Sequence, residues 1–182
     1  MTANISTRPL NRGYQPKLIA LGVEMHNESL IEFPALDAER IEEFLYLCET
    51  MPQLAYGVIA ESDQDAVGFI TATMGTHSFS GHLTGIHDCW YVKPTHRNGF
   101  IAKKLITGFE EWAFHNGAYR VVLAIHTGLN IDKMDRFIKL MGYEHMGGTY
   151  CKDVYDARNS NRNRQSLGRS GGYRGAFQGK AR

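Results

Sequence analysis

The residues best suited to chemistry follow one another in a single stretch of the chain. An apolar run, Cys89–Val92, is followed by a polar loop that carries one guanidinium, Arg97, and then by apolar residues at helical spacing from Phe100 onward. Gly99 stands directly before that helical pattern. The first turn of a helix offers N–H groups without intrahelical partners and a partial positive charge. The stretch therefore predicts an anion site, and phosphate is the usual occupant of such a site.

The same stretch resembles the cofactor motif of the GNAT superfamily, the acyl-CoA-dependent N-acyltransferases. The family pattern is V-x-P-x-x-R-x-x-G-x-G/A followed by a helix. It stands here as Val92, Pro94, Arg97, Phe100 and Ala102. Phe100 occupies the place of the first family glycine, and a glycine lies one position earlier. The resemblance implies that acetyl-CoA, or another acyl-CoA, is the co-substrate and that an amine accepts its acyl group by direct attack.

The resemblance also implies which residues bind the cofactor. Backbone groups of Trp90, Tyr91 and Val92 would bind the pantetheine and polarise the thioester. The pyrophosphate would be held by Arg97, by Lys103 or Lys104, and by the backbone amides of Asn98, Gly99, Phe100, Ile101 and Ala102. Either lysine has an ordinary alternative as a solvated cation on a helix face.

Acyl transfer requires a base that neutralises the attacking amine. Candidates are Asp88, His87, His126, Glu24 and Glu28. Asp88 precedes the centre of the cofactor strand, where burial would raise its pKa. His126 follows the neighbouring strand, and Glu28 follows the first helix, where the resembled fold lines its acceptor pocket. The alternatives are a strand-end carboxylate facing solvent for Asp88 and an ordinary loop histidine for His126.

The leaving thiolate raises the question of a general acid. The segment RFIKLMGY resembles a family ending, x-F-Y-x-x-x-G-F, in which the tyrosine often protonates the thiolate. Ile138 occupies that position here and cannot donate a proton. Tyr150 is a substitute phenol, and a thiolate can also leave unassisted. We interpret Cys89 as a small apolar strand residue, because no histidine and carboxylate pair is evident beside it to activate a nucleophile.

The elements that position these residues follow from periodicity and turn signals. Strands are expected over residues 5–9, 56–61, 66–74, 86–92, 119–125, 143–146 and 149–155. Helices are expected over residues 15–28, 37–51, 100–116 and 132–141, and residues 77–85 are expected to form a polar loop. This order predicts a mixed α/β (α+β) chain with one sheet and helices on both faces. The resemblance implies a mostly antiparallel sheet in which strands 86–92 and 119–125 splay apart to hold acyl-CoA.

Composition sets the broad class. A chain of 182 residues with 43% hydrophobic and 21% charged content is typical of a soluble globular protein. No apolar run approaches the roughly 20 residues of a membrane span, and the N-terminus lacks the apolar core of a secretory signal. Three scattered cysteines predict thiols in the reducing cytoplasm. The eight histidines show no metal-ligand spacing, so we expect no metal.

The charge is divided unevenly along the chain. Residues 1–156 hold 13 Lys and Arg and all 19 Asp and Glu, a formal charge of −6, whereas residues 157–182 hold seven basic residues and no acidic one. We therefore expect an acyltransferase domain over residues 1–156 and a flexible basic tail over residues 157–182. That tail is a solubility segment or an arm for nucleic acid or an acidic protein, with Tyr173 and Phe177 available to stack on bases.

A rival interpretation is a catalytically silent domain of the same fold. Such a protein would serve a structural or binding role, for example within a virion, and would use its basic tail to contact nucleic acid or a protein partner. Several short pairs, among them Glu28–Ser29 and Trp112–Ala113, resemble small phage-encoded members of the superfamily. Ile138 and Phe100 favour the silent domain, whereas Arg97 and Ala102 favour the enzyme. The sequence does not identify the acceptor amine.

Overall fold

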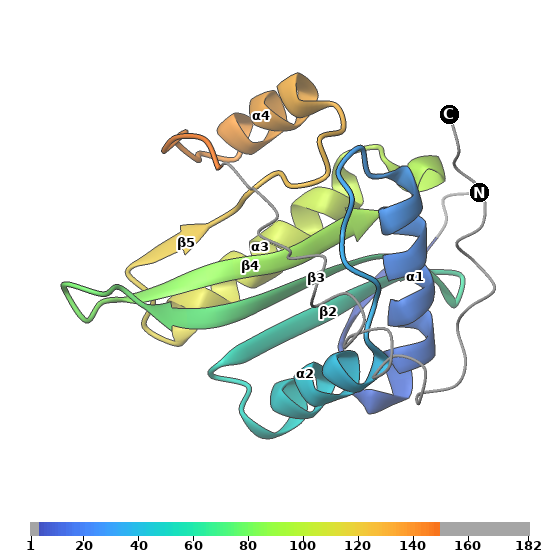
Figure 1. Cartoon of the computed structure of the whole chain (residues 1–182), viewed down its shortest axis with the longest axis horizontal. Coiled ribbons are helices and arrows are strands. Elements are labelled where there is room, and N and C mark those ends of the chain that lie inside the picture. The colour runs from blue at the N-terminus through green and yellow to red at the C-terminus, as the bar shows by residue number, and fades with distance from the viewer. Residues whose placement is uncertain (1–3, 150–182) are drawn as a thin grey trace, which may run out of the picture. The chain divides into compact units, whose positions relative to one another are not determined.

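A single mixed sheet forms the centre of the molecule (Figure 1). The computed structural model describes residues 4–149. The strands are β1 (Ile5–Pro9), β2 (Ala55–Ser62), β3 (Asp65–Thr76), β4 (Leu83–Val92) and β5 (Arg120–Val122), in the spatial order β1-β2-β3-β4-β5. The first four strands are mutually antiparallel, and β5 alone runs parallel to its neighbour β4. The predicted fold class, a mixed and mostly antiparallel sheet with helices, is confirmed.

The described residues form four helices: α1 (Gln15–Glu28), α2 (Ala38–Thr50), α3 (Phe100–His115) and α4 (Ile131–Leu140). Two short 3-10 turns, η1 (Arg12–Tyr14) and η2 (Pro94–His96), precede α1 and α3. Helix α2 begins where the sequence indicates, because the Asp37 carboxylate accepts hydrogen bonds from the N–H groups of Glu39 (2.9 Å) and Arg40 (3.3 Å). Helices α1 and α2 lie on one face of the sheet and α3 on the other (Figure 1).

The core is two apolar layers, one on each face of the sheet. Alternation along β3 sends Ile70 toward α3 and Phe69 toward α1 and α2. On the α3 face the fully buried helix residues are Ile101, Leu105, Ile106 and Phe109, and on the opposite face they are Leu21 and Leu45. Burying each such side chain stabilises the fold by about 1.5–3 kcal/mol.

Close approach of α3 to the sheet depends on glycine. A Cβ on Gly85 of β4 would lie 2.9 Å from the Cβ of Ala113, and a Cβ on Gly108 of α3 would lie 2.6 Å from the Tyr56 hydroxyl. Larger residues at either position would push the helix outward. The two glycines therefore keep α3 close to β4 and β2, and Val92 at the end of β4 and Ile101 in the first turn of α3 belong to the same buried cluster.

Several predicted bounds are wrong. Strand β4 begins at Leu83 rather than 86, because Leu83–Gly85 pairs with β3 and takes the end of the predicted loop over residues 77–85. Strand β5 covers only Arg120–Val122 instead of residues 119–125. Residues 143–146 form no strand, since residues 144–146 are exposed and gain nothing from the burial that stabilises strands. Of the strand predicted over residues 149–155, only Thr149 is described, and it is not in a strand.

Residues 1–143 form one compact unit, and residues 144–182 are assigned to a second, of which only residues 144–149 are described. The predicted boundary between residues 1–156 and the basic tail 157–182 lies outside the described residues, as do Tyr150 and Cys151. The tail and its partners stay predictions. Within residues 4–149, no helix is long and apolar enough to cross a membrane.

Candidate active site

Strands β4 and β5 separate soon after they pair. Their ladder joins Thr84 to Arg120, Gly85 to Val121 and Ile86 to Val122, and then stops. Strand β4 continues to Val92 with β3 as its partner. Among residues 4–149, no strand pairs with the edge of β4 that faces away from β3 beyond Ile86, so this edge is open from His87 onward. This is the splayed strand pair that the sequence predicts, and it opens earlier than the predicted strand 119–125 would allow.

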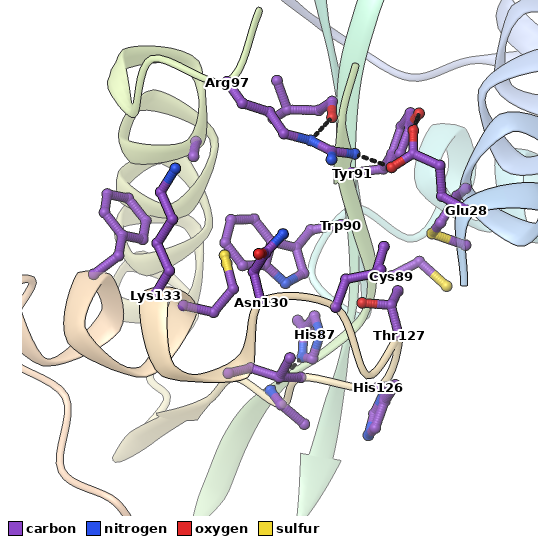
Figure 2. A pocket seen from close by; sticks show the side chains of 18 of the residues that line it. Glu28, His87, Cys89, Trp90, Tyr91, Arg97, His126, Thr127, Asn130 and Lys133 are labelled. Atoms are coloured by element: carbon purple, nitrogen blue, oxygen red, sulfur yellow. Dashed lines mark hydrogen bonds and ion pairs between the residues drawn. The ribbon is translucent and has the colours of Figure 1, made fainter. Parts of the chain in front are cut away.

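His87 lies at the point where the two strands separate (Figure 2). The backbone N–H of Ala124 donates to His87 Nδ1 at 3.2 Å, a bond that a continuing ladder would give to a β4 carbonyl. His87 is only 5% exposed, and its ring stacks on His126 at 5.9 Å between centroids. Burial, with a smaller contribution from His126, lowers the pKa of His87 to about 4. A neutral imidazole thus replaces the ladder, which explains why β5 ends at Val122.

A β-bulge places the predicted base Asp88 on the α1 and α2 face of the sheet. Thr71 pairs with Cys89 and Ala72 pairs with His87, so Asp88 is the extra residue of β4. The Thr73 hydroxyl donates to Asp88 Oδ1 at 3.2 Å. Desolvation raises the pKa of Asp88, and the Thr73 hydrogen bond opposes that rise. A raised pKa is the change expected for a base in this position.

The open edge presents backbone groups. The Lys93 N–H donates to the Val67 carbonyl of β3 at 2.8 Å, so by alternation the peptide groups of Trp90 and Val92 point away from β3, into the splay. The Val92 carbonyl already accepts a hydrogen bond from Arg97 Nε at 2.7 Å. The N–H and C=O of Trp90 therefore face the splay in the orientation that an added extended ligand requires.

The first turn of α3 forms the second part of the predicted cofactor site. Gly99 is the N-cap with φ +85°, and its carbonyl accepts the first helical bond, from the Lys103 N–H at 2.9 Å. The Phe100 N–H is bonded to Asn98 Oδ1, and the Asn98 N–H to the His96 carbonyl. The phenyl ring of Phe100 is 59% exposed, so it does not fill the loop. The remaining predicted amides, those of Gly99, Ile101 and Ala102, are the ones suited to an anion.

Arg97 and Glu28 bind each other in this structure. Arg97 Nη2 lies 2.6 Å from Glu28 Oε2, and the guanidinium stacks over the Tyr91 ring at 5.4 Å. The Tyr91 hydroxyl donates to the other Glu28 oxygen at 2.6 Å (Figure 2). Burial and the Glu28 carboxylate raise the pKa of Tyr91. Arg97 can therefore reach a phosphate, and Glu28 an amine, only after this ion pair separates.

Helix α4 contributes residues that sequence reasoning missed. Phe137 stacks on Trp90 with ring centroids 6.5 Å apart, and its ring lies 4.0 Å from the position of a Cβ on Gly99. Lys133 is one turn earlier on the same face of α4, and it lines a cavity together with Gly99 and Ala102 (Figure 2). The four-residue spacing of Lys133 and Phe137 predicts that they share a helix face, but no local signal places that face beside the anion site.

The cavity measures about 260 Å³ and passes through the splay. Most of the predicted site residues line it: Glu28, Asp88, Trp90, Tyr91, Val92, Arg97, Gly99, Ala102 and His126, together with His87. Other candidates lie outside its lining: Asn98, Phe100, Ile101, Lys103 and Ile138. Glu24, also outside, pairs with Lys93 at 3.0 Å, and the Lys104 ammonium lies 3.4 Å from the Ile5 carbonyl. These two contacts make Glu24 and Lys104 poor candidates for the site.

The two faces of β4 divide the cavity into two lobes. The α3 lobe contains Trp90, Val92, Gly99, Ala102, Lys133 and Phe137, and the α1 lobe contains Met25, His26, Glu28, Phe33, Asp88, Cys89 and Tyr91. Burial, with a smaller contribution from Asp88, raises the pKa of Cys89 to about 11, so its thiol is neutral and a poor nucleophile. Among the described residues, no group of three or more His, Cys, Asp or Glu could hold a metal ion.

This fold and site define a class of protein. The family model described as "Acetyltransferase (GNAT) family" matches residues 22–143, about two thirds of the chain. The chain therefore belongs to the GNAT family of acetyltransferases. No curated protein matches it.

Solved structures share the fold at low sequence identity. A ribosomal-protein-alanine N-acetyltransferase from Brucella melitensis biovar Abortus 2308 has a TM-score of 0.64 at 19% identity, covering 84% of this chain and 100% of its own. Glucosamine-6-phosphate N-acetyltransferase from Arabidopsis thaliana has a TM-score of 0.67 at 13% identity, covering 84% and 99%. An aminoglycoside N-acetyltransferase in complex with CoA has a TM-score of 0.66 at 15% identity, covering 84% and 96%.

Proposed function

We propose that this protein transfers an acetyl group from acetyl-CoA to an amine by direct attack in a ternary complex. The observation that carries the proposal is the open edge of β4 beside the first turn of α3. Backbone donors and acceptors at Trp90 and amide donors at Gly99, Ile101 and Ala102 lie next to one cavity. An amide-containing chain with a phosphate at one end matches both sets of groups.

The cofactor side of the site is the α3 lobe. The Trp90 peptide groups would bind the pantetheine amides and polarise the thioester carbonyl, and the helix N-terminus would bind the pyrophosphate. Lys133 adds a cation that forms no ion pair with any of residues 4–149. A cavity of about 260 Å³ is smaller than the roughly 300–1,000 Å³ of a drug-sized ligand site, so only the thioester end of acetyl-CoA would lie inside it.

The chemistry requires a neutral amine. Asp88 is the base we assign, because it lines the cavity beside the open edge and its pKa is raised toward the range useful for proton transfer. The Asp88 carboxylate takes one proton from the ammonium form of the acceptor, and the neutral nitrogen then attacks the thioester carbonyl. The C–S bond breaks as the C–N bond is completed, and the second proton of the nitrogen is lost to water. His126 is the alternative base, since it lies at the same end of the cavity, stacked on His87.

No general acid is assigned to the leaving thiolate. Ile138 does not line the cavity, and the Tyr91 hydroxyl donates its proton to Glu28. Departure of the thiolate without a proton donor, followed by protonation from water, is consistent with these residues. Among the described residues of the cavity, none therefore takes the place of the family tyrosine that protonates the leaving thiolate.

Calorimetric titration with acetyl-CoA and with CoA tests the proposal. A ligand that binds only the folded protein raises its stability, by about 2.7 kcal/mol at 100 times the dissociation constant, so a thermal shift must accompany binding. Release of CoA thiol in the presence of an amine panel then measures transfer. If neither acetyl-CoA nor CoA binds, the enzyme is excluded, and the silent structural or binding domain becomes the better description.

A further inference from the structure

The α1 lobe of the cavity has a distinct chemical character. Its walls come from the end of α1, from the segment that follows α1 and from the bulged part of β4. Met25 is 7% exposed, and the rings of His26 and Phe33 stack at 5.3 Å with 19° between their planes. Because successive side chains of a strand point to opposite faces, the Cys89 thiol of β4 also lies on this wall. The surface is thus apolar and aromatic, and it faces the open strand edge from the side opposite the phosphate-binding groups.

The charges of this lobe are almost all neutralised. Glu28 is held by Arg97 and by the Tyr91 hydroxyl (Figure 2). Burial lowers the pKa of His26, which keeps its imidazole neutral at pH 7. Asp88 is the one lining carboxylate of the lobe for which no cationic partner is found among residues 4–149. The lobe therefore offers one negative charge beside the reacting edge and apolar surface around it.

From this arrangement we infer that the acceptor is a primary amine with a single positive charge, carried on an aromatic or aliphatic body without phosphate or carboxylate. While Arg97 holds Glu28, as it does in this structure, a phosphate would find no unpaired guanidinium in the lobe, and a polycation would find a single free carboxylate, Asp88. An apolar body would instead displace water from Met25, Phe33 and the His26 ring, which is favourable in proportion to the area covered.

This inference rests on the proposed acetyl transfer and adds the class of acceptor to it. The ammonium group would bind beside Asp88 and pass one proton to that carboxylate. Its nitrogen lone pair then forms the C–N bond to the thioester carbonyl, the C–S bond breaks, and the electron pair leaves on sulfur. The second proton of the attacking nitrogen is lost to water, and the product is a neutral amide that no longer interacts with the Asp88 charge.

The experiment compares three amines on the full chain loaded with CoA. The probes are 2-phenylethylamine as the apolar monoamine, neamine as a polycation and glucosamine 6-phosphate as a phosphorylated amine. Calorimetry measures their binding, and thiol release from acetyl-CoA measures transfer. We expect 2-phenylethylamine to bind at least tenfold more tightly than either of the other two and to give the fastest transfer.

Two matched variants locate the site. Phe33→Ser removes an aromatic wall and should weaken 2-phenylethylamine binding about tenfold while leaving CoA binding unchanged. Leu30→Ser is the control on the same segment, because its side chain is 75% exposed and lies outside the cavity lining, and it should change neither affinity. Equal effects of the two substitutions would contradict the assignment of the wall.

The outcomes separate the two proposals. If CoA fails to bind, the proposed function is wrong. If CoA binds but 2-phenylethylamine does not, or if neamine or glucosamine 6-phosphate binds more tightly, the proposed function survives and the inferred acceptor class is overturned. Tighter binding of 2-phenylethylamine that is insensitive to Phe33→Ser would also overturn it, since the ligand would then lie elsewhere.

Discussion

The two halves of β4 have different surroundings. From Thr84 to Ile86 the strand has partners on both edges, β3 and β5, whereas from His87 to Val92 its one strand partner within the described part of the chain is β3. The paired half packs closely under α3 through Gly85. The half with one open edge lines the cavity. One strand therefore supplies both a rigid support and a binding edge, and the change occurs within a single residue step.

That change involves one side chain of β4 and one irregularity of its backbone. The His87 imidazole takes the Ala124 N–H, and the extra residue Asp88 shifts the register against β3. A neutral imidazole can accept this bond, and an imidazolium cannot. The separation of the strands is consequently sensitive to protonation of one buried side chain, whereas the paired half has no such dependence on His87.

The largest expected effect is loss of stability in acid. The unfolded chain protonates His87 near pH 6.5, but the folded chain resists protonation until about pH 4. Between these values the unfolded state binds more protons, so stability falls as pH falls, by roughly 3 kcal/mol from this group. His87→Asn keeps an acceptor oxygen near the Ala124 N–H and removes the titration. Urea unfolding at pH 7 and pH 4.5 should show a smaller acid loss in this variant than in the wild type.

His115→Asn is the matched control, because His115 is exposed at the end of α3 and does not line the cavity. The loss of stability of His115→Asn between pH 7 and pH 4.5 should equal that of the wild type. If His87→Asn loses as much stability in acid as the wild type, protonation of His87 is not the cause of that loss. Hydrogen exchange of the Ala124 amide offers a second measurement, since this amide should lose protection in acid before those of Val121 and Val122.

The next effect concerns Arg97. Arg97→Glu places a carboxylate opposite Glu28 and next to the predicted phosphate site, so we expect acetyl-CoA affinity to fall at least tenfold, or about 1.4 kcal/mol. Calorimetry measures it. The partner variant Glu28→Gln frees the guanidinium from its counter-ion and should leave acetyl-CoA affinity unchanged or improve it. A loss in Glu28→Gln as large as in Arg97→Glu would mean that the pair acts only by holding the loop in shape.

The sequence predicted the supports of the site better than its contacts. Residues 5–9 and 15–28 were assigned with their observed bounds, because local periodicity and turn residues determine them. The end of β5 was missed, since it depends on a bond from Ala124 to a side chain 37 residues earlier. Arg97 was placed in the right loop, but its pairing with Glu28, 69 residues away, leaves no local signal. Register and ion pairs of this kind are set by tertiary packing.

A smaller effect is expected at Lys133. Lys133→Glu reverses a charge in the α3 lobe without breaking an ion pair within residues 4–149, and it should weaken acetyl-CoA binding about fivefold, roughly 1 kcal/mol. Lys139→Glu on the same helix is the control with the same change in net charge, and its ammonium pairs with Asp135 at 2.8 Å away from the cavity. Similar losses in both variants would indicate a general effect of net charge instead of a site.

The smallest effect is a gain in stability at the bulge. Desolvation raises the pKa of Asp88 in the folded state, so the folded chain holds this proton at pH values where the unfolded chain has released it. Stability therefore falls as pH rises from about 4 through the raised pKa, and the ionised carboxylate costs stability at pH 7.

Asp88→Asn removes that cost and still offers an oxygen to the Thr73 hydroxyl. Because the side chain is exposed to water in the cavity, the gain is small, a rise in Tm of under about 3 °C at pH 7 that disappears near pH 4. Calorimetric melting at the two pH values measures it, and a lower Tm for Asp88→Asn at pH 7 would show that the charge of Asp88 stabilises the bulge, so that Asp88 would be a structural residue and not the base.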